Sequence, residues 1–171
     1  MDTTTSISAH ETAREFEALL ERHRGIVFKV AHTYCHDTDD RADLAQEIAA
    51  QLWHAYPSLD RARSVSTWMY RIALNVAISH VRRQVARAGR TVSLDDELHD
   101  IADDMAVTPE AAQHLRLLQA FIARQAPLDR ALLLLYLEDR PQREIADVLG
   151  ISETNVSTKI ARLKQRIRNE L

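Results

Sequence analysis

The chain has 171 residues, 46% of them hydrophobic, and its 22 Lys and Arg against 25 Asp and Glu give a net charge of −3. This length fits one domain or two small ones, and the apolar fraction excludes global disorder. Only 3 Gly and 4 Pro are too few turn residues for a sheet protein, and one Cys excludes a disulfide framework. The longest apolar run, residues 131–137, is too short for a bilayer, and no secretory signal is apparent. We therefore expect a soluble, cytoplasmic, all-α protein without membrane insertion.

The predicted helices divide into two groups of four. In the first, a capping box of Ser8 and Glu11 opens a helix, a second follows Gly25, a third runs from an Asp39 N-cap to about residue 56, and a fourth covers about 66–83. The second group begins at Thr108, with Pro109 at the first helical position, and Pro127 and Pro141 divide it further. The expected layout is a disordered tail (1–10), an N-terminal helical domain (11–86), an acidic flexible linker (87–108) and a C-terminal helical domain (109–171).

Charge is strongly segregated along this layout. Residues 80–91 carry four Arg and no acid, residues 92–110 carry seven acids and no Lys or Arg, and residues 159–168 carry five basic residues and no acid. Two basic surfaces on separate domains suit a polyanion such as nucleic acid. The alternative is solvated helix ends, where the helix dipole favours cations.

The segment 142–163 has the pattern of a helix-turn-helix. Ala146 allows close helix approach, Gly150 suits a turn with positive φ, and Val156 fills the angle between the two helices. The opposite face of the second helix carries side chains that can reach base edges and phosphates in a major groove, namely Asn155, Thr158, Lys159, Arg162 and Arg166. An ordinary helical hairpin with a solvated cationic face is the alternative.

The fourth predicted helix is apolar except for one polar row. Arg71, Asn75, Ser79 and Arg82 are spaced by four, four and three residues, so they share a face that can follow a nucleic-acid strand. Trp68 and Tyr70 flank this row as base-stacking candidates, although aromatics in such a helix are more often core residues.

Together these motifs resemble the extracytoplasmic-function (ECF) sigma factors, the compact two-domain members of the bacterial sigma-70 family. The resemblance rests on Asp-Leu-Ala-Gln-Glu at 43–47, Trp53, the run Ser-Thr-Trp-Met-Tyr-Arg-Ile-Ala-Leu-Asn at 66–75, the pair Arg82-Arg83 and the terminal helix-turn-helix. It covers nearly all of residues 13–170. It implies a non-enzymatic protein without a cofactor that binds core RNA polymerase and directs promoter recognition and melting.

The resemblance also implies roles for individual residues. The β′ coiled coil of core polymerase would be bound by Asp39, Asp40, Asp43, Gln46 and Glu47. The −10 element would be bound by Arg61, Arg63, Ser64, Thr67, Trp68, Arg71, Asn75, Ser79, Arg82 and Arg83. The −35 element would be bound by Arg143, Thr154, Asn155, Ser157, Thr158, Lys159, Arg162 and Arg166. The family further implies contact with the polymerase β flap, an acidic linker threaded through polymerase channels, and an anti-sigma factor.

The acidic residues also have an independent interpretation. Asp39, Asp43 and Glu47 recur every four residues, so their repulsion favours a cationic partner, although a solvated acidic face would look the same. The recognition helix begins Thr154-Asn155-Val156-Ser157-Thr158-Lys159 where the family often has Gly-Thr-Val-Lys/Arg-Ser-Arg. The loop after residue 59 lacks the usual Phe-Arg-Gly.

Three other functions compete with this interpretation. One is a helix-turn-helix regulator that binds duplex DNA without polymerase. Another is a metal site of His32, Cys35 and His36, for which a buried Cys beside helix-end histidines is the simpler explanation. The third is a helical metal-dependent phosphohydrolase built on Asp39, Asp43, Glu47 and His54, with acids from a second helix such as Glu15, Glu17 and Glu21.

Overall fold

The computed structural model describes residues 3–88 and 108–170, and the regular structure in these ranges is entirely helical. This confirms the all-α prediction. The first group contains α1 (Thr3–Arg22), α2 (Arg24–Tyr34), α3 (Thr38–Ala55), the 3-10 turn η1 (Tyr56–Ser58) and α4 (Val65–Ala88). The second contains α5 (Pro109–Ala123), α6 (Pro127–Leu137), α7 (Gln142–Leu149) and α8 (Glu153–Glu170). Most of the expected acidic linker, residues 89–107, lies outside the described residues.

Several helix ends differ from the sequence-based expectation. Helix α1 already begins at Thr3, where a tail to residue 10 was expected, and Ser8 lies inside it with its carbonyl accepting from Thr12 Oγ1 at 2.9 Å. The N-cap of α3 is Asp37 rather than Asp39. The Asp37 carboxylate accepts hydrogen bonds from the backbone amides of Asp39 and Asp40, at 2.9 and 3.1 Å. Helix α4 continues to Ala88 because no breaker precedes Gly89.

The predicted cap of α5 is confirmed, since Thr108 Oγ1 accepts from the amide of Ala111 at 3.3 Å. None of the described helices is long and apolar enough to cross a membrane.

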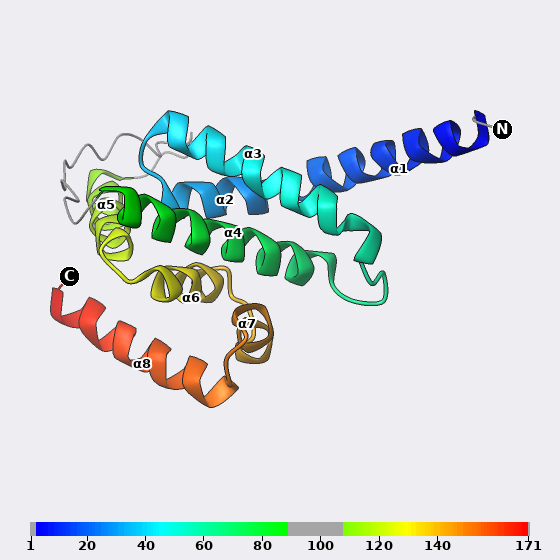
Figure 1. Cartoon of the computed structure of the whole chain (residues 1–171). Coiled ribbons are helices and arrows are strands. Elements are labelled where there is room, and N and C mark those ends of the chain that lie inside the picture. The colour runs from blue at the N-terminus through cyan, green and yellow to red at the C-terminus, as the bar shows by residue number, and fades with distance from the viewer. Residues whose placement is uncertain (1–2, 89–107, 171) are drawn as a thin grey trace.

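The core of the first group lies between α2, α3 and α4, which contact one another. Leu44, Ile48 and Leu52 form the buried face of α3, as their spacing predicts, and each is fully buried. Helix α1 reaches this core only near its end, where the Phe16 ring packs 5.0 Å from Trp53 and 5.3 Å from Tyr56. The rest of α1 projects away from the body (Figure 1).

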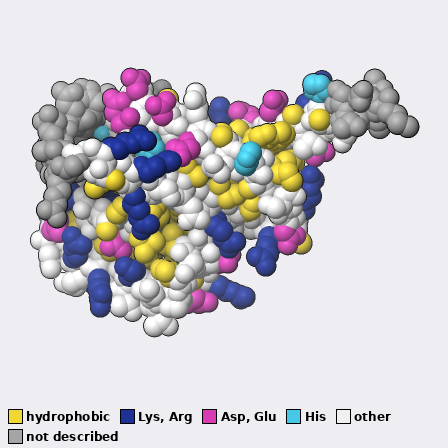
Figure 2. Space-filling view, viewed as in Figure 1, with side chains coloured by type: hydrophobic (Ala, Val, Ile, Leu, Met, Phe, Trp, Pro, Cys, Tyr) yellow, Lys and Arg dark blue, Asp and Glu magenta, His cyan; other side chains and the backbone are white. Residues whose placement is uncertain are grey.

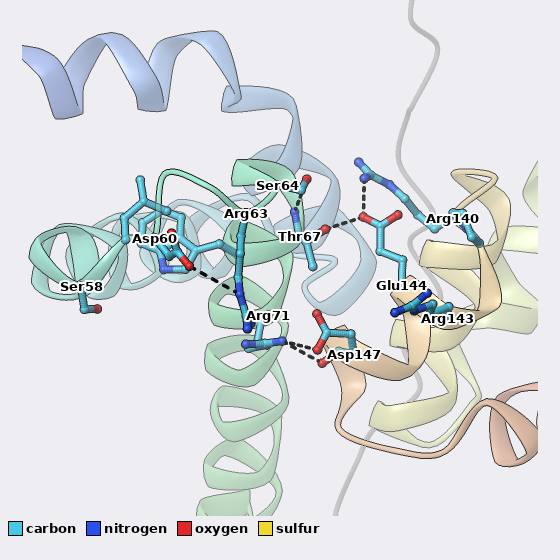
Figure 3. A pocket seen from close by; sticks show the side chains of 13 residues that line it. Ser58, Asp60, Arg63, Ser64, Thr67, Arg71, Arg140, Arg143, Glu144 and Asp147 are labelled. Carbon is cyan, nitrogen blue, oxygen red and sulfur yellow. Dashed lines mark hydrogen bonds and ion pairs between the residues drawn. The ribbon is translucent and has the colours of Figure 1, made fainter.

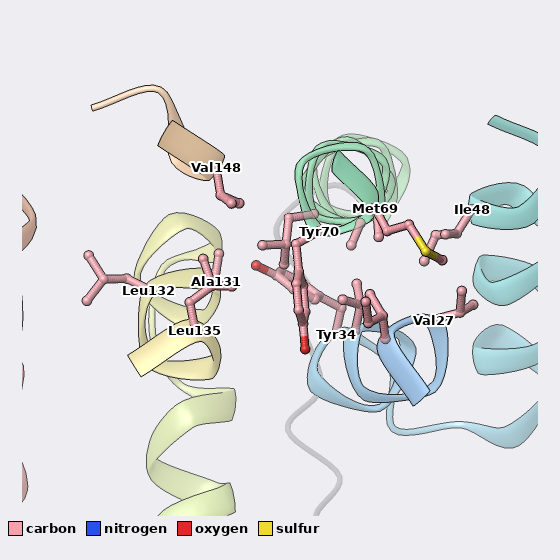
Figure 4. Packing of buried hydrophobic residues seen from close by; sticks show 14 of the residues in the cluster. Val27, Tyr34, Ile48, Met69, Tyr70, Ala131, Leu132, Leu135 and Val148 are labelled. Carbon is pink, nitrogen blue, oxygen red and sulfur yellow. The ribbon is translucent and has the colours of Figure 1, made fainter. Parts of the chain in front are cut away.

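The two helical groups pack against each other and share one hydrophobic core. Helix α2 contacts α5 and α6, and α4 contacts α6 and α7. Tyr34 and Tyr70 of the first group lie on the side of α2 and α4 that faces Ala131 and Leu135 of α6, and all four side chains are buried (Figure 4). Burial raises the pKa of Tyr34, so its phenol keeps its proton and donates to the carbonyl of Pro127 at 2.6 Å.

Candidate nucleic-acid interface

The polar row predicted on α4 lies on the surface for most of its length. Asn75, Ser79 and Arg82 are exposed, while Arg71 is half-buried. The other side of α4 supplies Met69, Tyr70, Ala73, Leu74 and Ala77 to the core. Tyr70 is therefore a core residue, as the alternative interpretation held, and its pKa is raised to about 12 by burial. Trp68 is partly buried and lines a cavity beside the row.

The loop before α4 is ordered by local polar contacts. The carboxylate of Asp60 accepts from the amide of Ala62 at 3.0 Å and pairs with Arg63 at 3.6 Å. Arg61 donates to Glu15 of α1 at 3.1 Å and to the Tyr56 hydroxyl at 3.3 Å. Ser64 caps α4 by accepting from the amide of Thr67 at 3.4 Å. The predicted loop residues Arg61, Arg63 and Ser64 thus lie exposed at the start of α4.

A cavity of about 820 Å³ separates this loop and the start of α4 from α7 (Figure 3). Across it, Thr67 Oγ1 donates to Glu144 at 2.6 Å, and Arg71 donates to the carboxylate of Asp147 at 2.7 Å and to its carbonyl at 3.2 Å. Arg140 joins the same group by donating to Glu144 at 2.8 Å. We call these bonds of Thr67 and Arg71 the α4–α7 contact.

The sequence did not predict the α4–α7 contact. Glu144 and Asp147 belong to the first helix of the helix-turn-helix, and 77 positions separate Thr67 from Glu144. Both acids lie on the polar face of an amphipathic helix, which is where solvated residues also lie. No local pattern distinguishes the two cases.

The helix-turn-helix forms as its spacing predicts. Gly150 ends α7 in the left-handed region at φ 67°, and Ser152 Oγ caps α8 by accepting from the amide of Asn155 at 3.1 Å. Val156, Ile160 and Leu163 are buried. Most of the predicted −35 residues are exposed, namely Arg143, Thr154, Asn155, Ser157, Thr158, Arg162 and Arg166. Lys159 is half-buried because it pairs with Asp129 at 3.2 Å.

The acidic surface at the start of α3 lies beside the basic end of α4. Figure 2 shows acidic side chains gathered over the start of α3 and basic side chains over the end of α4. Asp39, Asp43 and Gln46 are exposed and Asp40 is half-buried. Glu47 instead turns toward α4, where it accepts from Arg83 at 2.5 Å and from His80 at 3.4 Å. A predicted polymerase-binding residue and a predicted DNA-binding residue are therefore paired with each other.

This pair makes stability depend on pH in a defined direction. The hydrogen bond from Arg83 lowers the pKa of Glu47 below its ordinary 4.5. A lowered folded-state pKa stabilises the protein above pH 4.5, and the contribution is lost as the pH falls through the lowered value. The unfolding free energy of Glu47→Gln should therefore lie below that of the parent at pH 5–7 and approach it below pH 4.5 in urea titrations. The same comparison is made in proteins that carry Arg83→Gln. If the effect of Glu47→Gln on the unfolding free energy depends on pH as strongly there, the assignment to the Arg83 hydrogen bond is contradicted.

Several residues of the two metal-site hypotheses have other contacts in the structure. His32 Nε2 accepts from Arg41 at 2.8 Å while Nδ1 donates to the Phe28 carbonyl at 3.1 Å, and burial lowers its pKa. Burial raises the pKa of Cys35 to about 11. Glu15 and Glu47, proposed for the phosphohydrolase, pair with Arg61 and Arg83. Within residues 3–88 and 108–170, no group of three or more His, Cys, Asp or Glu could hold a metal ion.

Comparison with known families decides between the remaining interpretations. The family model described as Sigma-70 region 2 matches residues 19–87, and that of Sigma-70 region 4 matches residues 115–167. The chain belongs to the sigma-70 family. The first match covers the α4 row and the second covers the helix-turn-helix, so this sigma factor carries both regions that the sequence indicated.

Individual relatives place the sigma factor among the ECF members of the family. It is 26% identical to the ECF RNA polymerase sigma factor SigW of Bacillus subtilis, over 91% of this chain and 88% of SigW. It is 25% identical to the ECF sigma factor SigM of Mycobacterium tuberculosis, over 89% of this chain and 74% of SigM. It is also 29% identical to the probable RNA polymerase sigma factor RfaY of Xanthomonas campestris, over 85% of this chain but only 37% of RfaY.

A solved structure shares the fold. CnrH, in its complex with the cytosolic domain of CnrY, superposes with a TM-score of 0.64 at 23% identity, over 95% of this chain and 94% of that one. As an ECF sigma factor, the protein directs core RNA polymerase to promoters, in agreement with the function predicted from its motifs.

Proposed function

We propose that this sigma factor reads the −10 element with the exposed face of α4 and the −35 element with α8, while α3 docks on core polymerase. The observation that carries the proposal is the row of Asn75, Ser79 and Arg82, which is exposed on a helix whose other side is buried. Amide, hydroxyl and guanidinium groups in one line suit the phosphates and base edges of a single strand.

Promoter opening would follow from capture of unpaired bases rather than from covalent chemistry. Flipping a base out of the stack costs a few kcal/mol, which contacts with the loop at residues 60–64 and the start of α4 would offset. The residues we assign here are Arg61, Arg63, Ser64, Thr67, Trp68, Arg71, Asn75, Ser79, Arg82 and Arg83. The five arginines of this set and the basic face of α8 should make promoter binding strongly salt-dependent.

The core-polymerase surface would be the start of α3. Asp39, Asp43 and Gln46 are exposed there, and Asp40 and Glu47 border them. A basic surface, such as the β′ coiled coil that the family implies, is the complementary partner. We further assign contact with the β flap to the C-terminal helices. An anti-sigma factor that covers both groups of helices would regulate this cytoplasmic protein.

In vitro transcription tests the proposal directly. Purified protein is added to core RNA polymerase from its host with a library of candidate promoter fragments, and defined start sites are mapped. We expect transcripts that depend on both proteins. Duplex binding without any polymerase-dependent transcript would favour a helix-turn-helix regulator instead, and metal-dependent phosphoester hydrolysis would favour the enzyme. Core enzyme alone and the protein alone are the controls.

A further inference from the structure

The α4–α7 contact involves donors that the proposed function assigns to the −10 element. The Thr67 hydroxyl is bonded to Glu144, and the Arg71 guanidinium is bonded to Asp147. In Figure 3 both acidic side chains extend from α7 toward these two residues. A carboxylate resembles a phosphate in accepting from hydroxyl and guanidinium groups. The acids of α7 therefore hold groups that DNA would also bind.

Further contacts between the two groups of helices support the arrangement in which α7 lies against α4, which we call closed. Lys29 of α2 pairs with Glu138 at 2.6 Å, and the Tyr34 hydroxyl is bonded to the Pro127 carbonyl. The guanidinium of Arg140 lies 5.1 Å from the centre of the Tyr70 ring. Tyr34 and Tyr70 also belong to the apolar core that the two groups of helices share. The acids of α7 are thus presented to α4 by an extended interface.

The closed arrangement cannot serve both promoter elements at once. Elements centred at −10 and −35 are separated by about 25 base pairs, or roughly 85 Å at about 3.4 Å per pair. Helix α8 is only about 27 Å long, and it follows directly on α7, whose Asp147 is in contact with Arg71. Helix α7 must therefore leave α4 before α4 and α8 can both bind their elements.

We propose that Glu144 and Asp147 act as an internal substitute for DNA, which keeps the free protein closed and competes with the −10 strand for Thr67 and Arg71. This inference rests on the proposed function of the α4 face. Closure and single-strand binding are then mutually exclusive. By linkage, a change that weakens closure and leaves the DNA-binding groups intact strengthens binding of single-stranded DNA.

The first test removes the two acids without changing their size. Glu144→Gln/Asp147→Asn is compared with Glu17→Gln/Glu110→Gln, which removes two exposed acids from α1 and α5. The probe is a fluorescein-labelled random-sequence single-stranded DNA 20-mer at fixed salt. Opening is monitored by energy transfer between two dyes, one attached at Ala62→Cys and the other at Gln142→Cys. Native Cys35 is buried, so the dyes label only the introduced cysteines. For Glu144→Gln/Asp147→Asn we expect wider dye separation and at least fivefold tighter binding of the oligonucleotide than in the parent. The control variant should change oligonucleotide binding less than twofold.

A second variant separates closure from simple electrostatics. Lys29→Gln/Tyr34→Phe removes the α2–α6 hydrogen bonds at positions outside both proposed DNA faces. It also removes a positive charge, so electrostatics alone predicts weaker DNA binding. The proposal predicts wider dye separation and at least threefold tighter binding. Weaker or unchanged binding, or tighter binding without dye separation, would overturn it.

Transcription by the parent protein tests the underlying function separately. A promoter-specific transcript combined with unchanged dye separation in both variants would overturn internal competition alone. Dye separation with tighter oligonucleotide binding but no transcript from any fragment would overturn the proposed function, while competition between α7 and DNA would stand.

Discussion

An Asn75→Ala variant should bind duplex promoter DNA almost as tightly as the parent protein yet fail to keep it open. Asn75 is exposed in the middle of the α4 row. In the proposed mechanism its amide meets a base only after that base has left the stack. A contact of this kind contributes about 1–3 kcal/mol, so the equilibrium for opening should fall roughly 5- to 160-fold.

This result is measurable on a promoter that the parent protein transcribes. Permanganate reactivity of unpaired thymines reports opening, and gel shift on ice reports duplex binding by the polymerase complex. The matched control is Gln84→Ala, an exposed residue nine positions along α4 and so on the opposite face of the helix. Equal losses of duplex binding and opening in Asn75→Ala would remove this residue from strand capture.

A Val156→Asp variant should lose the folded helix-turn-helix altogether. Val156 has no exposed surface and lies in the first turns of α8, a helix that packs against α7. Burying an unpaired carboxylate there costs several kcal/mol, a large share of the 5–15 kcal/mol of a typical domain. We expect reduced helical circular dichroism, no cooperative melting of the C-terminal helices and no promoter-specific transcription.

The conservative substitution separates charge burial from lost packing. Val156→Ala leaves a small cavity and should cost about 1–3 kcal/mol, which lowers the melting temperature without abolishing the fold. Its transcription at low temperature should remain near the parent level. A Val156→Asp protein that melts like Val156→Ala would show that this position is not an anchor of the turn.

Local sequence signals predicted most of the fold because the relevant interactions are themselves local. The α3 stripe of Leu44, Ile48 and Leu52 and the turn at Gly150 depend on spacing within one or two helices. Helix ends were less predictable. Asp37, Asp39 and Asp40 are all good capping residues, and only the backbone shows that Asp37 accepts the free amides.

The functional surfaces were predictable as faces but not as sets of contacts. Periodicity placed Asn75, Ser79 and Arg82 together on one side of α4, where the structure also has them. It could not show that Glu144 and Asp147, far along the chain, contact the start of that face. Nor could it show that Glu47 pairs with Arg83, because long-range pairing depends on how whole helices pack.

The Glu47–Arg83 pair has a consequence for the order of assembly. If Glu47 exchanged its ion pair with Arg83 for one with a basic group of polymerase, the Arg83 guanidinium would be left unpaired beside the α4 row. The freed cation could then neutralise one more phosphate, which would steepen the salt dependence of promoter binding by about one unit of logarithmic slope. Recruitment to the enzyme would in this way raise the protein's attraction for DNA.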